Sequence, residues 1–151
     1  MTEINFNTPE AKIAKEVAQQ FVAKRSGHIM KNTSLRRETE IMLLRVSELE
    51  PKQGDRLREL VKSLDISEEN CLKSLTKIGE KMLNAEISWG RIISFFLFTA
   101  LVMEHLKSSG KDSHTEKISQ WLGLCIAQRS TWIRQSGGWV SSCFVYVFLG
   151  E

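Results

Sequence analysis

The chain has 151 residues, of which 42% are hydrophobic and 26% are charged. This length fits one domain covering residues 1–151, long enough to bury a substantial core, and the composition is that of a globular protein. The net charge is only +3, from 21 basic and 18 acidic residues spread along the chain, which argues against a nucleic-acid-binding surface with clustered lysines and arginines.

The two prolines suggest helix boundaries in the amino-terminal half. Thr8 is a good N-cap and proline suits the first helical position, so Pro9 should begin a helix that Ser26–Gly27 ends. Pro51 has no backbone N–H, and Gly54 disfavours helix. The pattern therefore predicts a second helix at about 34–50 and a short third helix at about 57–64.

A fourth helix should follow, with Ser67 as its cap. Glu68 and Glu69 would then lie in its first turn, where carboxylates suit the helix dipole. Its apolar side comprises Leu72, Leu75, Ile78, Met82 and Leu83.

The stretch "SWGRIISFFLFTALVM" begins at Ser88, a good N-cap, and should form a helix that lasts to about Lys107. Residues 92–103 carry no charge. A membrane span needs about 20 apolar residues, and runs of about 10–14 are more often core helices. A helix that is apolar on all sides must be surrounded by other elements. We therefore expect the central helix of a helical domain and no stable membrane span.

Further helices are expected at about 114–129 and just after Arg129. Gly137 and Gly138 should make a tight turn between two tryptophan-anchored segments. Residues 139–149 are strongly apolar with mixed helix and strand propensity, so their structure stays open.

No side chains form a recognisable catalytic or metal-binding group. The three histidines fall in different segments, and the sequence has no glycine-rich phosphate loop. Cys71, Cys125 and Cys143 have unrelated spacings, which favours reduced thiols in a cytosolic protein over disulfides or a zinc site. Residues 1–10 are polar, so no signal peptide is expected. The sequence predicts neither an enzyme nor a cofactor.

Two tryptophan motifs resemble those of a known family. "SWGRIISFFLFTALVMEHLK" is similar to the first homology motif of the B-cell lymphoma 2 (Bcl-2) family of apoptosis regulators, and "TWIRQSGGWVSSCF" is similar to the second. "LVKSLDISEENCLKSLTKI" and "ALVMEHLK" resemble the myeloid cell leukaemia member. The resemblance implies an all-α bundle of about seven to eight helices around a central apolar pair, at 88–107 and about 114–129, with a surface groove.

In this family the groove receives the amphipathic BH3 helix of pro-apoptotic proteins. The resemblance places Arg91 where the family's arginine meets the ligand's aspartate, and Gly90 where the ligand backbone needs space. For each apolar position, a place in the core is the alternative. Carried over by position, the groove residues are Ser88, Gly90 and Arg91, walls of Leu57, Leu60 and Leu64 and of Ile78 and Met82, and a floor of Phe95 and Phe98.

The third homology motif is degenerate around "LLRVSELE". Thr39 and Glu50 occupy places that should be apolar, and a killer member needs a competent motif to activate its own kind. We therefore expect an anti-apoptotic protein that sequesters pro-apoptotic partners. The alternatives are a pro-apoptotic, pore-forming member and a helical scaffold without a groove ligand.

The chain ends at Glu151, soon after the second motif, without the family's carboxyl-terminal membrane anchor. A truncated chain and a naturally compact homologue would both look like this. A short, divergent member resembles viral homologues that modulate host-cell apoptosis. We expect a cytoplasmic protein that reaches the mitochondrial outer membrane through its partners. We also expect a homodimer, because an empty apolar groove tends to be covered.

Overall fold

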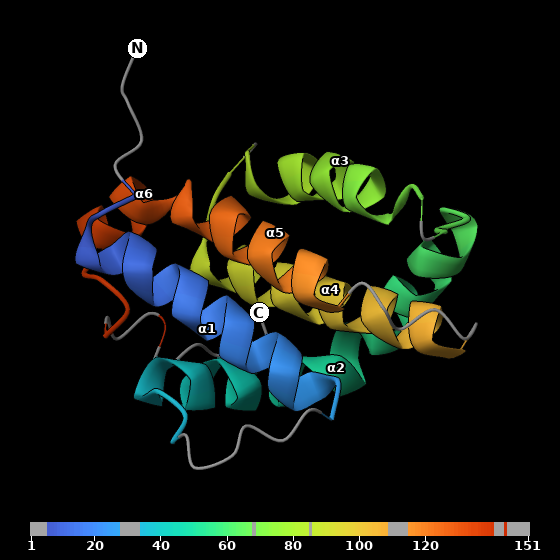
Figure 1. Cartoon of the computed structure of the whole chain (residues 1–151), viewed down its shortest axis with the longest axis horizontal. Helices are drawn as coiled ribbons and strands as arrows, with labels where there is room; N and C mark the ends of the chain where they lie inside the picture. Colours follow the sequence, from blue (N-terminus) through green and yellow to red (C-terminus); the bar gives the residue numbers. More distant parts are fainter. Residues whose placement is uncertain are drawn as a thin grey trace.

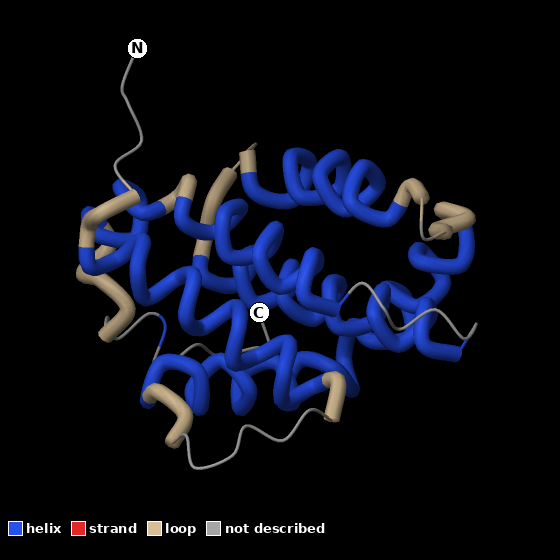
Figure 2. Tube along the Cα trace, viewed as in Figure 1, coloured by secondary structure: helices blue, strands red, loops and turns tan. Residues whose placement is uncertain are grey.

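One helix, α4 (Trp89–Ser108), runs through the middle of the molecule, with the other helices around it (Figure 1). The structure, a computed structural model, describes residues 6–27, 34–67, 69–84, 86–108, 115–140 and 144. Every regular element among these residues is a helix (Figure 2), so the all-α fold class is confirmed. The remaining helices are α1 (Pro9–Arg25), α2 (Arg37–Ser63), α3 (Cys71–Leu83), α5 (Thr115–Ala127) and α6 (Ser130–Gln135).

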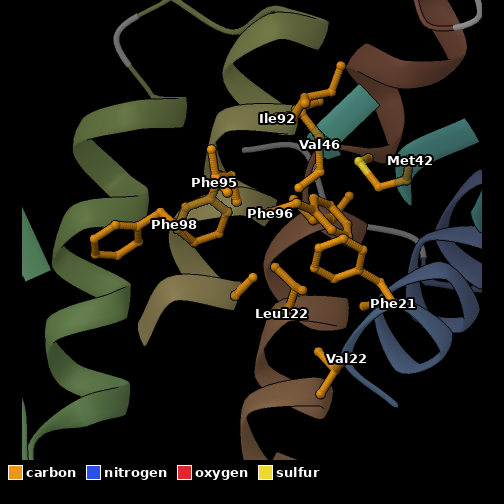
Figure 3. Close-up of a cluster of buried hydrophobic side chains, with 14 of the residues drawn as sticks. Phe21, Val22, Met42, Val46, Ile92, Phe95, Phe96, Phe98 and Leu122 are labelled. Atoms are coloured by element: carbon orange, nitrogen blue, oxygen red, sulfur yellow. The ribbon is translucent and has the colours of Figure 1, made fainter. Parts of the chain in front are cut away.

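Residues 95–103, in the middle of α4, are buried on every side of the helix, and all of them except Thr99 are apolar. Phe96 lies with Phe21 of α1 and Met42 of α2, whereas Phe95 and Phe98 lie on the other side of α4 (Figure 3). The rings of Phe21 and Phe96 meet edge to face with centroids 5.1 Å apart. All five side chains are fully buried. The predicted central core helix is confirmed.

By length and composition alone, α4 could also cross a membrane. It has 20 residues, and an 18-residue window within it has a mean hydropathy of 1.3. The helix reaches this length because it extends beyond the uncharged residues 92–103, on which the sequence-based length argument rested. The fold buries 67% of the apolar window, as expected for the core helix of a globular domain.

The amino-terminal helix begins where the sequence predicts. Thr8 Oγ1 accepts a hydrogen bond of 3.2 Å from the backbone N–H of Ala11, and Pro9 is the first helical residue. Gly27, just after the helix, has a φ of 81°, a conformation that favours glycine. α1 then packs along α5, and α2 packs on α4.

Pro51 does not break α2, and the predicted second and third helices are one helix of 27 residues. Proline removes the hydrogen bond to the carbonyl four residues earlier. Here that carbonyl belongs to Ser47, and both residues are exposed, so water can satisfy it. Leu57 and Val61 continue the helix into the core. Tertiary packing thus outweighs the local stop signal, and the described residues hold six helices instead of seven to eight.

α3 begins at Cys71, later than predicted. Ser67 and Asn70 form a turn before it: Ser67 N–H donates to Asn70 Oδ1 at 2.8 Å, and Asn70 N–H donates to Ser67 Oγ at 3.3 Å. Glu69 therefore lies ahead of the helix, and Glu68 lies outside the described residues.

The predicted glycine turn follows α6. Gly137 and Gly138 have φ values of 100° and 79°, which only glycine adopts without strain. Most of the segment 139–149, including Cys143, lies outside the described residues, as does residue 114 before α5.

Candidate functional site

The two tryptophan motifs meet at the start of α4. The ring of Trp89 lies 5.5 Å from that of Trp132 and 5.2 Å from that of Trp139, measured between centroids, and 4.6 Å from Phe144. Trp139 Nε1–H donates to the carbonyl of Glu10 at 3.1 Å, which ties the cluster to α1. Aromatic side chains bury large areas and hold their geometry well. The cluster therefore fixes the first turn of α4 rigidly.

That first turn presents one cation beside open space. Ser88 Oγ accepts the backbone N–H of Arg91 at 3.1 Å, which confirms Ser88 as the predicted cap. The Arg91 side chain is exposed, and its Nη1–H donates to the carbonyl of Met82 at 3.4 Å, a long and therefore weak bond. A Cβ at Gly90 would meet nothing nearer than Ser88 Oγ at 3.8 Å. A ligand backbone could approach closely here.

The five predicted wall residues divide by exposure. Leu60 and Leu64 at the end of α2 and Met82 of α3 are half-buried and packed against the core. Leu57 and Ile78 are more deeply placed, at 7% and 9% exposure. α2 and α3 both pack on α4 and have few contacts with each other. Their half-buried apolar side chains could therefore accept apolar groups of a ligand between them.

The two predicted floor residues lie below the surface. Phe95 and Phe98 are both fully buried. The Phe95 ring lies 5.4 Å from that of Trp121 on α5, and α3 approaches it so closely that a Cβ at Gly79 would lie 2.9 Å from Phe95 Cζ. A ligand reaches the Phe95 ring only if α3 moves. In this conformation both rings belong to the core beneath the surface.

Two polar contacts show how α2 and α4 run relative to each other. Ser94 Oγ and Gln53 Oε1 lie 3.1 Å apart, and Arg58 Nη2 lies 3.9 Å from Glu104 Oε2. α2 therefore runs alongside α4 in the same direction, with its last leucines toward the carboxyl end of α4. Met82 and Arg91 lie at the other end. We call this surface, formed by Leu60, Leu64, Met82, Gly90 and Arg91, the Arg91 face.

Sequence reasoning missed Ser94 and Gln53. Ser94 lies three residues after Arg91 and so shares its side of α4. This spacing from Arg91 could have indicated that Ser94 lies on the same face of the helix. A serine inside an apolar run, however, looks like a tolerated core residue. The bond to Gln53 shows that this strip of α4 is polar and lies against α2.

The described residues offer little reactive chemistry. No three of their His, Cys, Asp and Glu side chains gather to hold a metal ion. Burial raises the pKa of the Cys125 thiol, although nearby Arg129 opposes the shift. The thiol is thus held in its neutral form, which is a poor nucleophile. The Arg91 face suits recognition of a ligand with apolar groups and one acid.

Comparison with known proteins identifies the family. Residues 42–139 match the sequence profile of the apoptosis regulator proteins of the Bcl-2 family. The human protein named Bcl-2 homologous antagonist/killer is 27% identical over 88 residues. That match covers 55% of this chain and only 40% of the killer protein.

Solved structures share the fold. Trichoplax adhaerens trBcl-2L2, bound to trBak BH3, superposes with a TM-score of 0.74 at 20% identity, covering 86% of this chain and 94% of that one. The zebrafish pro-survival protein NRZ, in complex with Bad BH3, gives 0.70 at 24% identity, covering 86% and 89%. Chicken BOK gives 0.71 at 20% identity, covering 86% and 91%. At these identities the likeness is one of fold.

Proposed function

Because this chain belongs to the Bcl-2 family of apoptosis regulator proteins, we propose that it is a pro-survival member that binds the BH3 helix of pro-apoptotic proteins. The ligand lies on the Arg91 face, between α2 and α3. The observation that carries this proposal is the exposed Arg91 beside the open space at Gly90, at one end of a row of half-buried apolar side chains.

The dimensions suit one amphipathic helix. From Arg91 to Glu104, which is beside Arg58 of α2, α4 extends about 20 Å at a rise of about 1.5 Å per residue. A ligand helix of similar length can place apolar anchors near Leu60 and Met82 and one acid near Arg91. Anchors at helical spacing supply affinity in such complexes. The arginine can hold the acid with two parallel hydrogen bonds, which fixes the register.

The structural neighbours support this ligand class. The Trichoplax and zebrafish proteins with this fold are each described in complex with a BH3 segment. Physically, the complex removes the half-buried apolar side chains from water and pairs the exposed guanidinium. Sequestering a BH3 helix keeps it from other members of the family, which restrains apoptosis.

The second candidate is a pro-apoptotic role, favoured by the match to the human killer protein and the fold of chicken BOK. The degenerate third motif weighs against it, because its polar residues Thr39 and Glu50 form bonds with α1. Thr39 is fully buried and donates to Gln20 Oε1 of α1 at 2.7 Å. Glu50 pairs with Arg25 at 3.2 Å and Arg58 at 2.7 Å. Releasing this segment would break the bonds to Gln20 and Arg25 of α1.

Titration with Bak and Bad BH3 peptides tests the proposal. We expect saturable binding with a Kd of about 1 µM or tighter for at least one peptide. The protein should leave liposomes intact and should suppress release caused by a pro-apoptotic member. Dye release by this protein alone would support the killer role. No binding to any peptide would support a scaffold.

We further propose that the protein acts from the cytoplasm and reaches mitochondria through its partners. The buried position of α4 supports this, because membrane insertion would require α4 to leave the core. Flotation with liposomes should leave the protein in the soluble fraction. Quantitative flotation in the absence of partners would overturn this part of the proposal.

A further inference from the structure

Two arginines from different parts of the chain donate hydrogen bonds to the carboxyl end of α3. On the Arg91 face, Arg91 Nη1–H donates to the carbonyl of Met82 at 3.4 Å. Arg129, in the turn between α5 and α6, donates through Nη2 to Oδ1 of Asn84, the C-cap residue of α3. The Met82 carbonyl and the Asn84 side chain both belong to the carboxyl end of α3, and their donors come from different elements. Two separate ties therefore restrain this end of α3.

A further hydrogen bond joins α3 to α5 itself. Trp121 Nε1–H donates to Thr76 Oγ1 at 2.9 Å, and the Thr76 hydroxyl donates in turn to the carbonyl of Leu72 at 2.7 Å. The Trp121 ring also packs on Phe95, which lies under α3. Thr76 and Asn84 line the same cavity and so lie on the same side of α3. We call the pairs Trp121–Thr76 and Arg129–Asn84 the α5 clasp.

A cavity of about 290 Å³ lies beside the clasp, and its lining includes Glu80, Cys125, Gln128 and Arg129. Close packing at Gly79 sets the distance of α3 from Phe95, and beside the cavity the bonds of the clasp add to that packing. Loss of one bond should let the end of α3 shift.

We propose that the α5 clasp holds α3 in place when Arg91 turns from the Met82 carbonyl to the ligand's carboxylate. Trp121 and Arg129 are positioning residues that do not touch the ligand. This inference rests on the proposed function. Two parallel bonds from Arg91 to an acid fix the plane of the guanidinium, which ends its long bond to Met82. In the complex, the clasp is then the one of these two ties that remains, beside the core packing of Leu83.

The test compares Asn84→Ala in two backgrounds. With Arg91 present, this variant should weaken a BH3 peptide by about three- to tenfold, the size expected for the net contribution of one ordinary hydrogen bond, mainly through faster dissociation. In an Arg91→Ala background the loss should be below about twofold, because the ties on α3 are then the same in the free and bound states. Equal losses in both backgrounds would overturn the proposal.

Two variants serve as controls. Gln128 accepts from Arg129 at 3.1 Å in the same cavity but makes no tie to α3, so Gln128→Ala should leave affinity unchanged. Asn84→Asp keeps an acceptor for Arg129 and should restore affinity. A loss in Gln128→Ala as large as that in Asn84→Ala, or no rescue by Asn84→Asp, would mean that a general disturbance of the cavity causes the effect.

Hydrogen exchange tests the clasp without any peptide. The backbone N–H at position 84 donates to the carbonyl of Glu80 at 3.0 Å and reports on the last turn of α3. Asn84→Ala and Arg91→Ala should each raise its exchange rate by at most about twofold, and together by about tenfold, because either tie suffices alone. If no BH3 peptide binds the unaltered chain, the proposed function is wrong, and these exchange rates alone then test the clasp. A double variant whose exchange rate rises by no more than the two single increases combined would refute the clasp.

Discussion

The middle of α4 is enclosed in the core, whereas its first turn has an exposed side. Residues that stabilise the fold and residues proposed to bind a ligand therefore lie in separate parts of one helix. Phe96, in the middle, is fully buried and meets Phe21 edge to face. Arg91, five residues earlier, is exposed beside a glycine with open space around it. A change in the middle should therefore cost stability, and a change in the first turn should cost affinity.

The largest effect is expected for Phe96→Ala. Removing a fully buried aromatic ring leaves a cavity and should lower the free energy of unfolding by about 3–5 kcal/mol. Urea denaturation measures this loss. Phe96→Leu, which keeps most of the volume, should lose clearly less. A Phe96→Ala protein as stable as the unaltered chain would show that the core does not depend on this face of α4.

The next effect concerns the buried polar contact that holds α2 to α1. Gln20 Oε1 accepts from the Thr39 hydroxyl at 2.7 Å and from the Arg36 backbone N–H at 2.9 Å. Gln20→Leu should lower the free energy of unfolding by about 1–3 kcal/mol, because the buried hydroxyl loses its acceptor. Its exposed neighbour Gln19 is the control: Gln19→Leu should change stability little. Equal effects of the two variants would contradict the role of this contact.

The same contact illustrates the limit of sequence reasoning. Thr39 looked like a defect in an apolar motif, but in the fold it is a satisfied buried donor. Its acceptor comes from α1, nineteen residues away in sequence, and no local pattern indicates that pairing. The continuity of α2 through Pro51 is a similar case, because packing further along the helix decides it.

Local signals succeeded where neighbours in sequence make the contact. Thr8 and Ser88 cap their helices because a side chain needs to reach only three residues ahead. The wall residues were indicated by resemblance, but their exposure was not, and the burial of Phe95 and Phe98 depends on α3 and α5. The homodimer, the viral origin and the likeness to the myeloid cell leukaemia member stay predictions.

A pair of glycines sharpens the contrast between folding and binding. Gly90→Ala should keep or raise stability by at most about 1 kcal/mol, because alanine favours helix, and should weaken a BH3 peptide by at least about tenfold, or about 1.4 kcal/mol. At Gly123 a Cβ would lie 3.1 Å from Lys15 Cα of α1. Gly123→Ala should therefore lower stability and leave affinity unchanged. Urea denaturation and peptide titration measure both, and the reverse pattern would contradict the assignment of Gly90 to the site.

The central claim is that Arg91 pairs with an acid of a bound BH3 helix, and a double-mutant cycle tests it most directly. Arg91→Ala should weaken the peptide by about ten- to a hundredfold, or about 1.4–2.7 kcal/mol, and should leave the Tm nearly unchanged because the side chain is exposed. Replacing the peptide's aspartate with alanine should cost a similar amount with Arg91 present and little in the Arg91→Ala background. If the two losses simply add, Arg91 does not make this pair.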